Sequence, residues 1–409
     1  MTTTMKKALV PAYLTSFQCI GPACEDSCCS TWGIHIDKPT YKKYVNLRPS
    51  PFSFEVKKKL KRFRNGTDTK YAEIILEANK ACPFQSKEGW CGMQQTYGEE
   101  YLSNTCRTYP RIHNYVDNRV EISTTLSCPE AARLVLLNPN GLVFEEKVVP
   151  TVPPDYFSLI INQKQMSDPK YHSLHDLRLF VMSLLQYRVY TLEERLWILG
   201  MFIHELEPVI DQPEQVSSVM LKYVQRIENL SYKGMIDELP THETFLLNWF
   251  SLLYRAALRN YANHRYMECF REFQQGLNLS ENDERSFKEL GDLYTERKRA
   301  YYEPFMKEHE YLLENYAVHY AFQQLLPYGK RLSPFQQYMQ LIINITLIKI
   351  HLIGMSGHHE GLNPELVVKL IQSLVKRLEH SDDLMRSCMK SLDEMGLQNM
   401  AAASICLRT

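Results

Sequence analysis

The stretch Cys19-Ile20-Gly21-Pro22-Ala23-Cys24-Glu25-Asp26-Ser27-Cys28-Cys29 sets the character of the first third of this chain. Two adjacent cysteines cannot both join one compact disulfide framework without strain, whereas thiolates at short intervals can converge on a soft cation or an iron–sulfur cluster. Eight of the eleven cysteines lie within the first 128 residues. The pattern predicts a metal site built from Cys19, Cys24, Cys28, Cys29, Cys82, Cys91, Cys106 and Cys128.

Two alternatives to a metal site are eight ordinary buried thiols and four disulfides. Disulfides need an oxidising compartment. The segment Met5–Val10 briefly imitates a secretory signal, but Pro11 and Thr15 interrupt its apolar run and no small-x-small cleavage site follows. We therefore expect a cytoplasmic protein, whose reduced thiols favour metal ligation.

Composition limits the partners. The 47 basic side chains equal the 47 acidic ones, so no net field recruits nucleic acid or an anionic membrane. The most apolar stretch, Leu341–Met355, contains Asn344, Lys349 and His351, which argues against a membrane span. The one basic run, Lys57–Arg64, fits a solvated helix face, with contact to a polymer or an acidic partner as the alternative.

The prolines at 150, 153 and 154 suggest a stiff connector, where we place a domain boundary. Residues 1–150 are expected to form a cysteine-rich iron–sulfur domain with a few short strands, such as 32–36 and 120–123. Residues 151–409 are expected to form an α-helical domain, which makes the fold mainly α. No Gly-x-Gly occurs anywhere, so we expect no Rossmann fold.

Several helix boundaries can be read directly. Thr191 and Glu194 form a capping box before an apolar stripe. Asn363-Pro364 supplies an N-cap followed by a proline at the first helical position. A last helical segment beginning at Ser381 is expected to end at Gly396.

Together, several motifs resemble those of the flagellin lysine N-methylases. They are Cys19-x4-Cys24-x3-Cys28-Cys29-x2-Trp32-x-Ile34-x-Ile36, Ala81-Cys82-Pro83-Phe84, Gly89-x-Cys91, Cys106-Arg107-x-Tyr109-Pro110-Arg111 and Ser127-Cys128-Pro129-Glu130-Ala131-Ala132-Arg133, with Leu313-Glu314-Asn315-Tyr316 as a weaker echo downstream. The cysteine half is also similar to small zinc- or iron-chelating domains with a CxxCxxCC signature.

The resemblance implies a bacterial enzyme that uses S-adenosyl-L-methionine to methylate lysines of flagellin, with a cysteine-bound [4Fe-4S] cluster. Without a Gly-x-Gly turn, the cofactor must bind differently from a Rossmann ligand. The usual radical spacing C-x3-C-x2-C is also absent, because Cys24-x3-Cys28 is followed directly by Cys29. We therefore favour direct displacement, in which the cluster is structural, regulatory or a cofactor anchor.

Polar residues beside the late cysteines are the candidates for chemistry. A free lysine amine has a pKa of about 10.4, so a desolvating pocket or a base must help remove its proton. Arg107, Arg111 and Arg133 are candidates to clamp the cofactor carboxylate. Tyr109 and Glu130 are candidate catalytic residues, although Pro129–Arg133 also reads as an ordinary helix start.

Other polar and thiol residues read as structural. His358-His359 fits an interhelical turn better than a metal pair, and Cys269, Cys388 and Cys406 read as small buried side chains. An iron or zinc carrier and a zinc-stapled interaction scaffold remain alternatives to the enzyme. The sequence leaves open which four cysteines bind the cluster, which residue is the base, which lysines are modified and the oligomeric state.

Overall fold

A computed structural model describes residues 5–30, 33–150, 152, 156–253, 263–279, 285–329, 332–379, 382–396 and 398–408. Trp32, Pro153, Pro154 and Ser381, to which some of the predictions refer, lie outside the described residues. Most of the described chain is helical, as expected.

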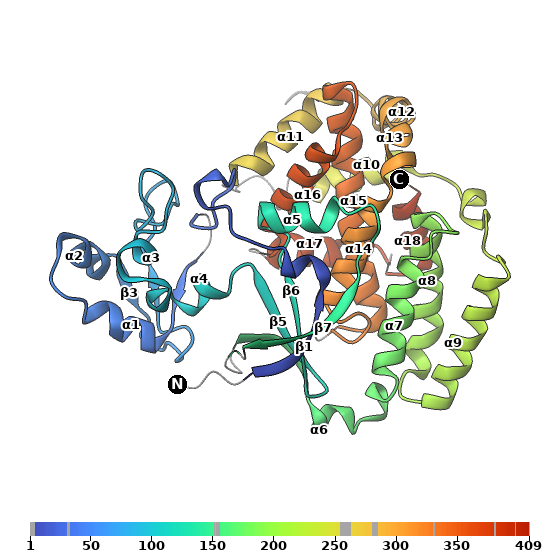
Figure 1. The fold of residues 1–409 in the computed structure, drawn as a ribbon. Coiled ribbons are helices and arrows are strands. Elements are labelled where there is room, and N and C mark those ends of the chain that lie inside the picture. The colour runs from blue at the N-terminus through green and yellow to red at the C-terminus, as the bar shows by residue number, and fades with distance from the viewer. Residues whose placement is uncertain are drawn as a thin grey trace.

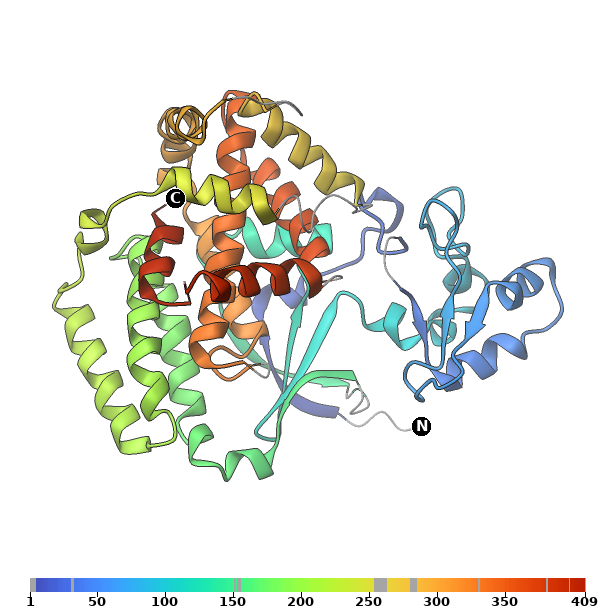
Figure 2. The same ribbon diagram turned by 180° about the vertical axis from the view of Figure 1, so that it is seen from behind.

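A small lobe projects from a larger body (Figures 1 and 2). It holds a three-stranded sheet in the order β2–β4–β3 and four short helices. Its own apolar core includes Ile36, Tyr44, Val56 and Met93. The elements are β2 (His35–Ile36), α1 (Lys38–Val45), α2 (Pro51–Lys58), β3 (Leu60–Arg62), β4 (Ala72–Ile74), α3 (Gly92–Tyr97) and α4 (Asn104–Thr108).

The body contains a five-stranded mixed sheet in the order β7–β1–β6–β5–β8. β1 runs parallel to β6 and antiparallel to β7, while β5 and β6 form a hairpin and β8 pairs parallel to β5. At the hairpin turn Asp117 and Asn118 have φ of 45° and 62°, as tight two-residue turns require. The strands are β1 (Met5–Pro11), β5 (Arg111–Val116), β6 (Arg119–Thr124), β7 (Phe144–Pro150) and β8 (Phe157–Ile161).

The remaining helices pack around this sheet and around the long helix α15 (Figure 1). Thr191 and Glu194 cap α8 reciprocally and Asn363 accepts a hydrogen bond from Leu366 N–H, which confirms both predicted starts. Gly396 has a φ of 66° just beyond α17, as expected of a helix terminator. The helices are α5 (Pro129–Leu136), α6 (Gln163–Met166), α7 (Leu174–Leu185), α8 (Leu192–Leu206), α9 (Pro213–Glu228), α10 (Glu243–Leu253), α11 (His264–Gly276), α12 (Phe287–Arg297), α13 (Glu303–His309), α14 (Tyr311–Gln323), α15 (Pro334–His359), α16 (Pro364–Glu379), α17 (Asp382–Glu394) and α18 (Met400–Leu407).

The structure groups the chain differently from the predicted division at residue 150. Residue 150 ends β7, and β8, which follows it, joins the same sheet as β1. The main apolar core joins Tyr13, Leu126 and Val135 to the C-terminal helices. The proline-rich segment therefore connects two strands of one sheet, and the sheet depends on the helices to cover it.

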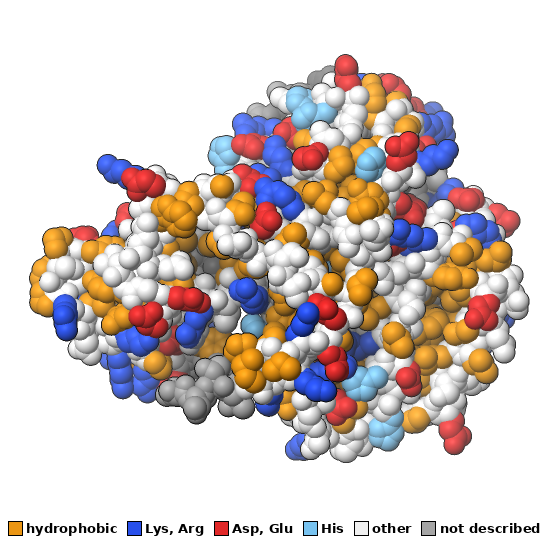
Figure 3. Space-filling model, in the orientation of Figure 1, with side chains coloured by type: hydrophobic (Ala, Val, Ile, Leu, Met, Phe, Trp, Pro, Cys, Tyr) orange, Lys and Arg blue, Asp and Glu red, His pale blue; other side chains and the backbone are white. Residues whose placement is uncertain are grey.

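The basic run Lys57–Arg64 is not one helix face. α2 ends at Lys58 and the edge strand β3 begins at Leu60. Lys59 and Lys61 pair with Glu77 and Glu73 at 2.8 and 2.9 Å. Figure 3 shows basic and acidic side chains interspersed over this side of the molecule, in line with the balanced composition.

Helix α15 is long and apolar enough to cross a membrane by length and composition, and it is the one such candidate among the described residues. Of its most apolar window, 94% is buried inside the molecule. Two of its polar residues have partners there: Lys349 bonds Glu193 and Leu407 O, and His351 bonds Tyr266. Among the described residues, Asn344 Oδ1 is buried without a hydrogen-bond partner. α15 thus has the properties of a core helix.

A seam of buried polar side chains on α14 fastens the sheet to the helices. Asn315 donates to Asn138 O at 2.7 Å, and His319 Nε2 lies 3.0 Å from the Tyr13 hydroxyl. One turn further, Gln323 Nε2 donates to Thr124 O at 2.9 Å. Residues four apart share one helix face, so a single stripe of α14 meets segments distant in sequence.

Helices α11 and α15 approach closely at Gly276 and Gly354, which leads to the first prediction. A Cβ on Gly276 would overlap the Gly354 carbonyl oxygen, which belongs to rigid backbone. We expect Gly276→Ala to destabilise the fold by about 1–3 kcal/mol, the usual cost of overpacking, as measured by urea unfolding. Gln275→Ala, at an exposed position of the same helix, is the control; equal stability of the two variants would contradict this packing.

Candidate functional site

All eight N-terminal cysteines are free thiols. They fall into two neighbouring groups, one in the core of the small lobe and one where the lobe meets the body. Cys28 is close to both groups. Its pKa is raised by Cys29 and Cys106, which belong to the lobe group, and by Cys19 at the junction.

The lobe group consists of Cys29, Cys82, Cys91 and Cys106, which all pack in or against the apolar core of the lobe. The Cys82 N–H donates to the Cys29 carbonyl at 2.7 Å, which ties two of the segments together. Burial first, and then the neighbouring thiols, raise the pKa values of Cys82 and Cys106 to about 12. Without a cation, these thiols remain protonated.

The second group consists of Cys19, Cys24 and Cys128. Cys128 occupies the N-cap position of α5, and burial raises its pKa to about 11, with smaller contributions from Cys24 and Cys19 that act in the same direction. Burial also raises the pKa of Cys24.

Cys28 and Cys29 behave as one coupled pair. A hydrogen bond between the two thiols raises the pKa of Cys28 and lowers that of Cys29. Burial opposes the lowering at Cys29, but Ser27 and Lys376 add to it, and the pKa of Cys29 falls to about 7. Of these two thiols, Cys29 is the one that ionises first.

The cysteines suit a soft metal by chemistry, although the side chains do not close around one point. Among the described residues, no three Cys, His, Asp or Glu side chains stand in an arrangement able to hold a metal ion. The lobe group nevertheless supplies four sulfur donors from several segments, of which Cys82 is buried and the other three are partly buried. Four is the number of donors that a zinc ion or a four-iron cluster takes. The residues fit such a group in kind and number.

Two acidic residues between the cysteines anchor this loop to the helical body. Asp26 forms an ion pair with Lys376 of α16 at 2.7 Å, with the two side chains only 13% and 3% exposed. Gln372 donates to Asp26 at 2.7 Å and to Ser127 O at 2.8 Å. Glu25 pairs with Arg133 of α5 and with Arg265 of α11 at 3.3 Å. The cysteine loop is thereby held against three helices.

The predicted polar candidates lie along this junction and most have protein partners. Arg133 bonds Glu25 and, at 2.8 Å, Glu130, so α5 carries an ion pair where a cofactor clamp was predicted. Glu130 is also in the first turn of α5, which confirms that Pro129–Arg133 begins a helix.

The other three candidates lie on separate elements. Tyr109 OH lies 3.2 Å from the Ser127 hydroxyl, Arg107 donates to Asn104 at 2.5 Å, and Arg111 covers the Phe17 ring. The structure thus brings Glu130 and Arg133 together, and does not converge the three arginines on one point. Their role in cofactor binding stays a prediction.

The histidine pair and the three C-terminal cysteines were predicted to be structural residues. His358 and His359 belong to the last turn of α15 and not to the predicted interhelical turn, and His359 lies 3.2 Å from Glu272. Cys269, Cys388 and Cys406 are buried, as expected.

A cavity of about 280 Å³ near the C-terminal end of the body was not predictable from the sequence. Lys298 and Lys349 line it, together with the start of α8 and the end of α18. In the sequence Lys298 belongs to the charged run Glu296–Arg299, which is typical of a solvated helix face. Only the fold shows that its amine is enclosed.

Comparison with known proteins identifies a family for the helical part of the chain. Residues 178–406 match the family described as the FliB lysine N-methylase C-terminal domain. The chain belongs to this family. The matched range starts in α7, so the small lobe and its cysteines lie outside it.

Several curated relatives agree with this assignment. Proteins named lysine-N-methylase from Salmonella typhimurium and Salmonella choleraesuis are each 29% identical over 224 residues. A flagellar biosynthetic protein, FliU, from Salmonella muenchen is 34% identical over 138 residues, which are 34% of this chain and 81% of that protein. The chain spans about half the length (53%) of the two methylases. No solved structure matches significantly.

The buried Asp26–Lys376 pair yields the second prediction. Asp26→Asn removes the ion pair between Asp26 and Lys376, and breaking a buried ion pair typically costs about 3–5 kcal/mol. We expect faster amide hydrogen exchange in residues 17–30 than in the native protein. Asp68→Asn, at an exposed pair with Lys38, should leave this exchange unchanged; the same behaviour in both variants would contradict the anchoring role.

Proposed function

We propose that this chain transfers methyl groups from S-adenosyl-L-methionine to lysine side chains of flagellin. The observation that carries the proposal is the match of residues 178–406 to the lysine N-methylase family. The names of the methylases and of the flagellar relative support the reaction and the substrate. Lysine methylation needs a neutral amine aligned with the methyl carbon and its sulfonium leaving group.

We further propose that the lobe cysteines Cys29, Cys82, Cys91 and Cys106 hold a [4Fe-4S] cluster. Their shared place in or against one apolar core and their number support this choice of four among the eight. The cluster would supply a cross-link within a lobe whose own apolar core is small, and metal binding would then be coupled to folding of the lobe. Through their ion pairs, Glu25 and Asp26 would connect the folded lobe to α5, α11 and α16.

The third prediction concerns metal content. Protein purified without oxygen is expected to carry about four irons and four sulfides per chain. Alanine at Cys82 or Cys106 should abolish the visible absorption, whereas alanine at buried Cys269 should preserve it, because Cys269 lies in the helical body. Stoichiometric zinc without sulfide, or full iron content in both lobe variants, would contradict the assignment.

The fourth prediction concerns activity. Incubated anaerobically with S-adenosyl-L-methionine and flagellin, the chain is expected to add methyl groups to surface lysines and to release S-adenosylhomocysteine. Peptide mass spectrometry and chromatography of the nucleoside product measure both. Cluster-loaded protein that leaves every flagellin lysine unmodified, with or without a reductant, would refute the substrate and favour a metal-carrying role.

A further inference from the structure

The cavity near the end of the chain is lined in part by the side chain of Lys298. It is bounded by the start of α8, the turn Met235–Glu238, α13, and the end of α18. Residues Lys298–Tyr302 on its wall form a π-helical turn. Such turns are rare and often occur at functional sites. At about 280 Å³, the cavity is below the roughly 300–1,000 Å³ of sites for drug-sized ligands, and it suits one side chain.

The π turn presents Lys298 and Tyr302 to this cavity, and Lys298 carries the amine. Its Nζ donates to the Arg408 carbonyl at 3.4 Å. Burial, and then the nearby Lys349 ammonium, lower its pKa to about 8. The charged groups that face it are Lys349 of α15, Glu303 of α13, Glu243 of α10 and Glu193 of α8.

The carboxylates of the cavity are largely committed to other cations. Glu193 pairs with Lys349 at 3.0 Å, and Lys349 is 3% exposed, so this pair forms an inner wall. Asp237 pairs with Arg408 at 2.9 Å. Glu303 and Glu243 raise the pKa of Lys298, but burial and the Lys349 ammonium outweigh them.

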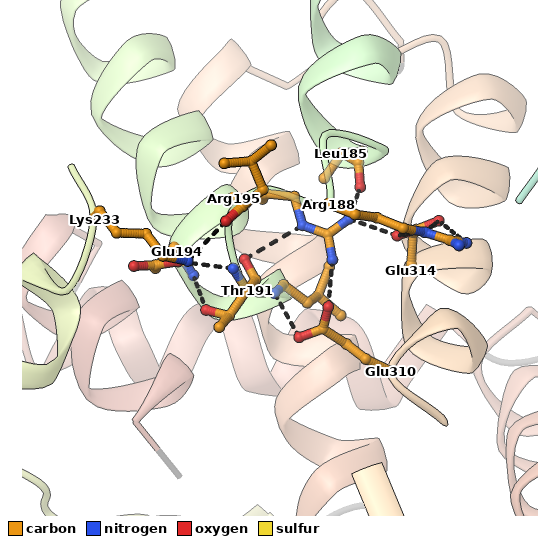
Figure 4. A network of polar contacts seen from close by, with 10 residues as sticks. Leu185, Arg188, Thr191, Glu194, Arg195, Lys233, Glu310 and Glu314 are labelled. Carbon is orange, nitrogen blue, oxygen red and sulfur yellow. Dashed lines mark hydrogen bonds and ion pairs between the residues drawn. The ribbon is translucent and has the colours of Figure 1, made fainter. Parts of the chain in front are cut away.

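A buried ionic network fixes the same wall (Figure 4). Glu310 accepts the Leu192 N–H at 2.8 Å and pairs with Arg195 at 2.6 Å. Arg195, which is fully buried, also pairs with Glu314 at 2.6 Å. Since each charge in this network is opposed, Glu310 is held in place and is not available as the strong partner that Lys298 lacks.

The rest of the cavity suits a lysine side chain. Leu192, Met306 and Leu313 offer apolar contact for a methylene stem, and Tyr302 offers an aromatic ring. With Lys298 neutral, a lysine that entered as an ammonium would place a second positive charge beside Lys349. Like charges in one small, partly desolvated space disfavour the protonated form, so the entering amine is pushed toward its neutral, nucleophilic state.

We propose that this cavity is the methyl-acceptor site, that it takes a lysine side chain of the protein substrate, and that Lys298 accepts the proton of that lysine. The inference rests on the proposed function. The substrate N–H bond breaks with its electron pair left on nitrogen, and the proton moves to Lys298 Nζ. The nitrogen then forms a bond to the methyl carbon as the carbon–sulfur bond breaks, with that pair retained by sulfur as S-adenosylhomocysteine leaves. The methylated ammonium and Lys298 later release their protons to solvent.

The first test measures the amine without any turnover. Competitive acetylation of the whole protein across pH 6–11, read by peptide mass spectrometry, should titrate Lys298 near pH 8 and Lys369 higher, since ion pairs with Glu272 and Glu268 raise the pKa of Lys369. Excess flagellin should slow acetylation of Lys298 and not of Lys369. A Lys298 that titrates like a surface lysine, or that flagellin leaves unprotected, would overturn the acceptor-site assignment.

The second test, the fifth prediction, uses three variants. Lys298→Met and Lys298→Arg should each lower kcat at least 100-fold, because neither side chain can accept a proton near neutral pH, while both keep a long, unbranched stem. Lys369→Met is the matched control and should methylate at the native rate. In the native protein kcat/KM should rise as pH increases through about 8, where Lys298 loses its proton.

The outcomes separate this inference from the function on which it rests. Native protein that methylates flagellin while both Lys298 variants retain its rate would refute the role of Lys298 alone. Rescue by arginine would show a structural cation and also refute it. If the native protein methylates nothing, the proposed function fails, and the acetylation experiment still decides whether flagellin occupies the cavity.

Discussion

The polar face of α14 is the constraint on which the rest of the structure depends. Asn315, His319 and Gln323 are almost wholly buried, and each is hydrogen-bonded to a segment from the first 140 residues. Burying such groups without partners would cost several kcal/mol each, so the sheet and the helices must dock in one register. On the same helix Glu314 receives Arg188 and Arg195, which ties α14 to α8 and to the wall of the Lys298 cavity.

The contacts of α14 also account for a short motif in the sequence. Leu313-Glu314-Asn315-Tyr316 was the one downstream part of the resemblance, and it lies in α14 where the helical core, the sheet and the ionic network meet. Leu313 and Tyr316 face apolar neighbours, while Glu314 and Asn315 bond other elements. Few residues satisfy all of these contacts together, which explains why such a motif marks the core rather than a reacting group.

Local signals in the sequence predicted local structure well. The capping residues of α8 and α16 and the terminator at Gly396 were predictable because caps act through neighbouring backbone groups. The division at residue 150 was not, because proline content shows a stiff segment and not what its two ends join. Strand β8 pairs with β5, some 40 residues earlier, and no local pattern reports that pairing.

The candidate functional site was also only partly predictable from the sequence. The eight cysteines were visible as a cluster, but their separation into a lobe group and a junction group depends on tertiary packing. Arg133 was chosen for its nearness to Cys128, and its partner Glu25 comes from a loop more than 100 residues away. Lys298 could not be identified at all, since its enclosure depends on α8, α15 and the chain end together.

We propose that the methyl group passes intact from the sulfur of S-adenosyl-L-methionine to a lysine amine. The most direct measurement is to supply S-adenosyl-L-methionine with a fully deuterated methyl group and to determine the mass of each modified flagellin peptide. Direct displacement predicts that every added methyl retains all of its deuterium. Modified lysines that have lost deuterium, or flagellin with no added label, would contradict the account.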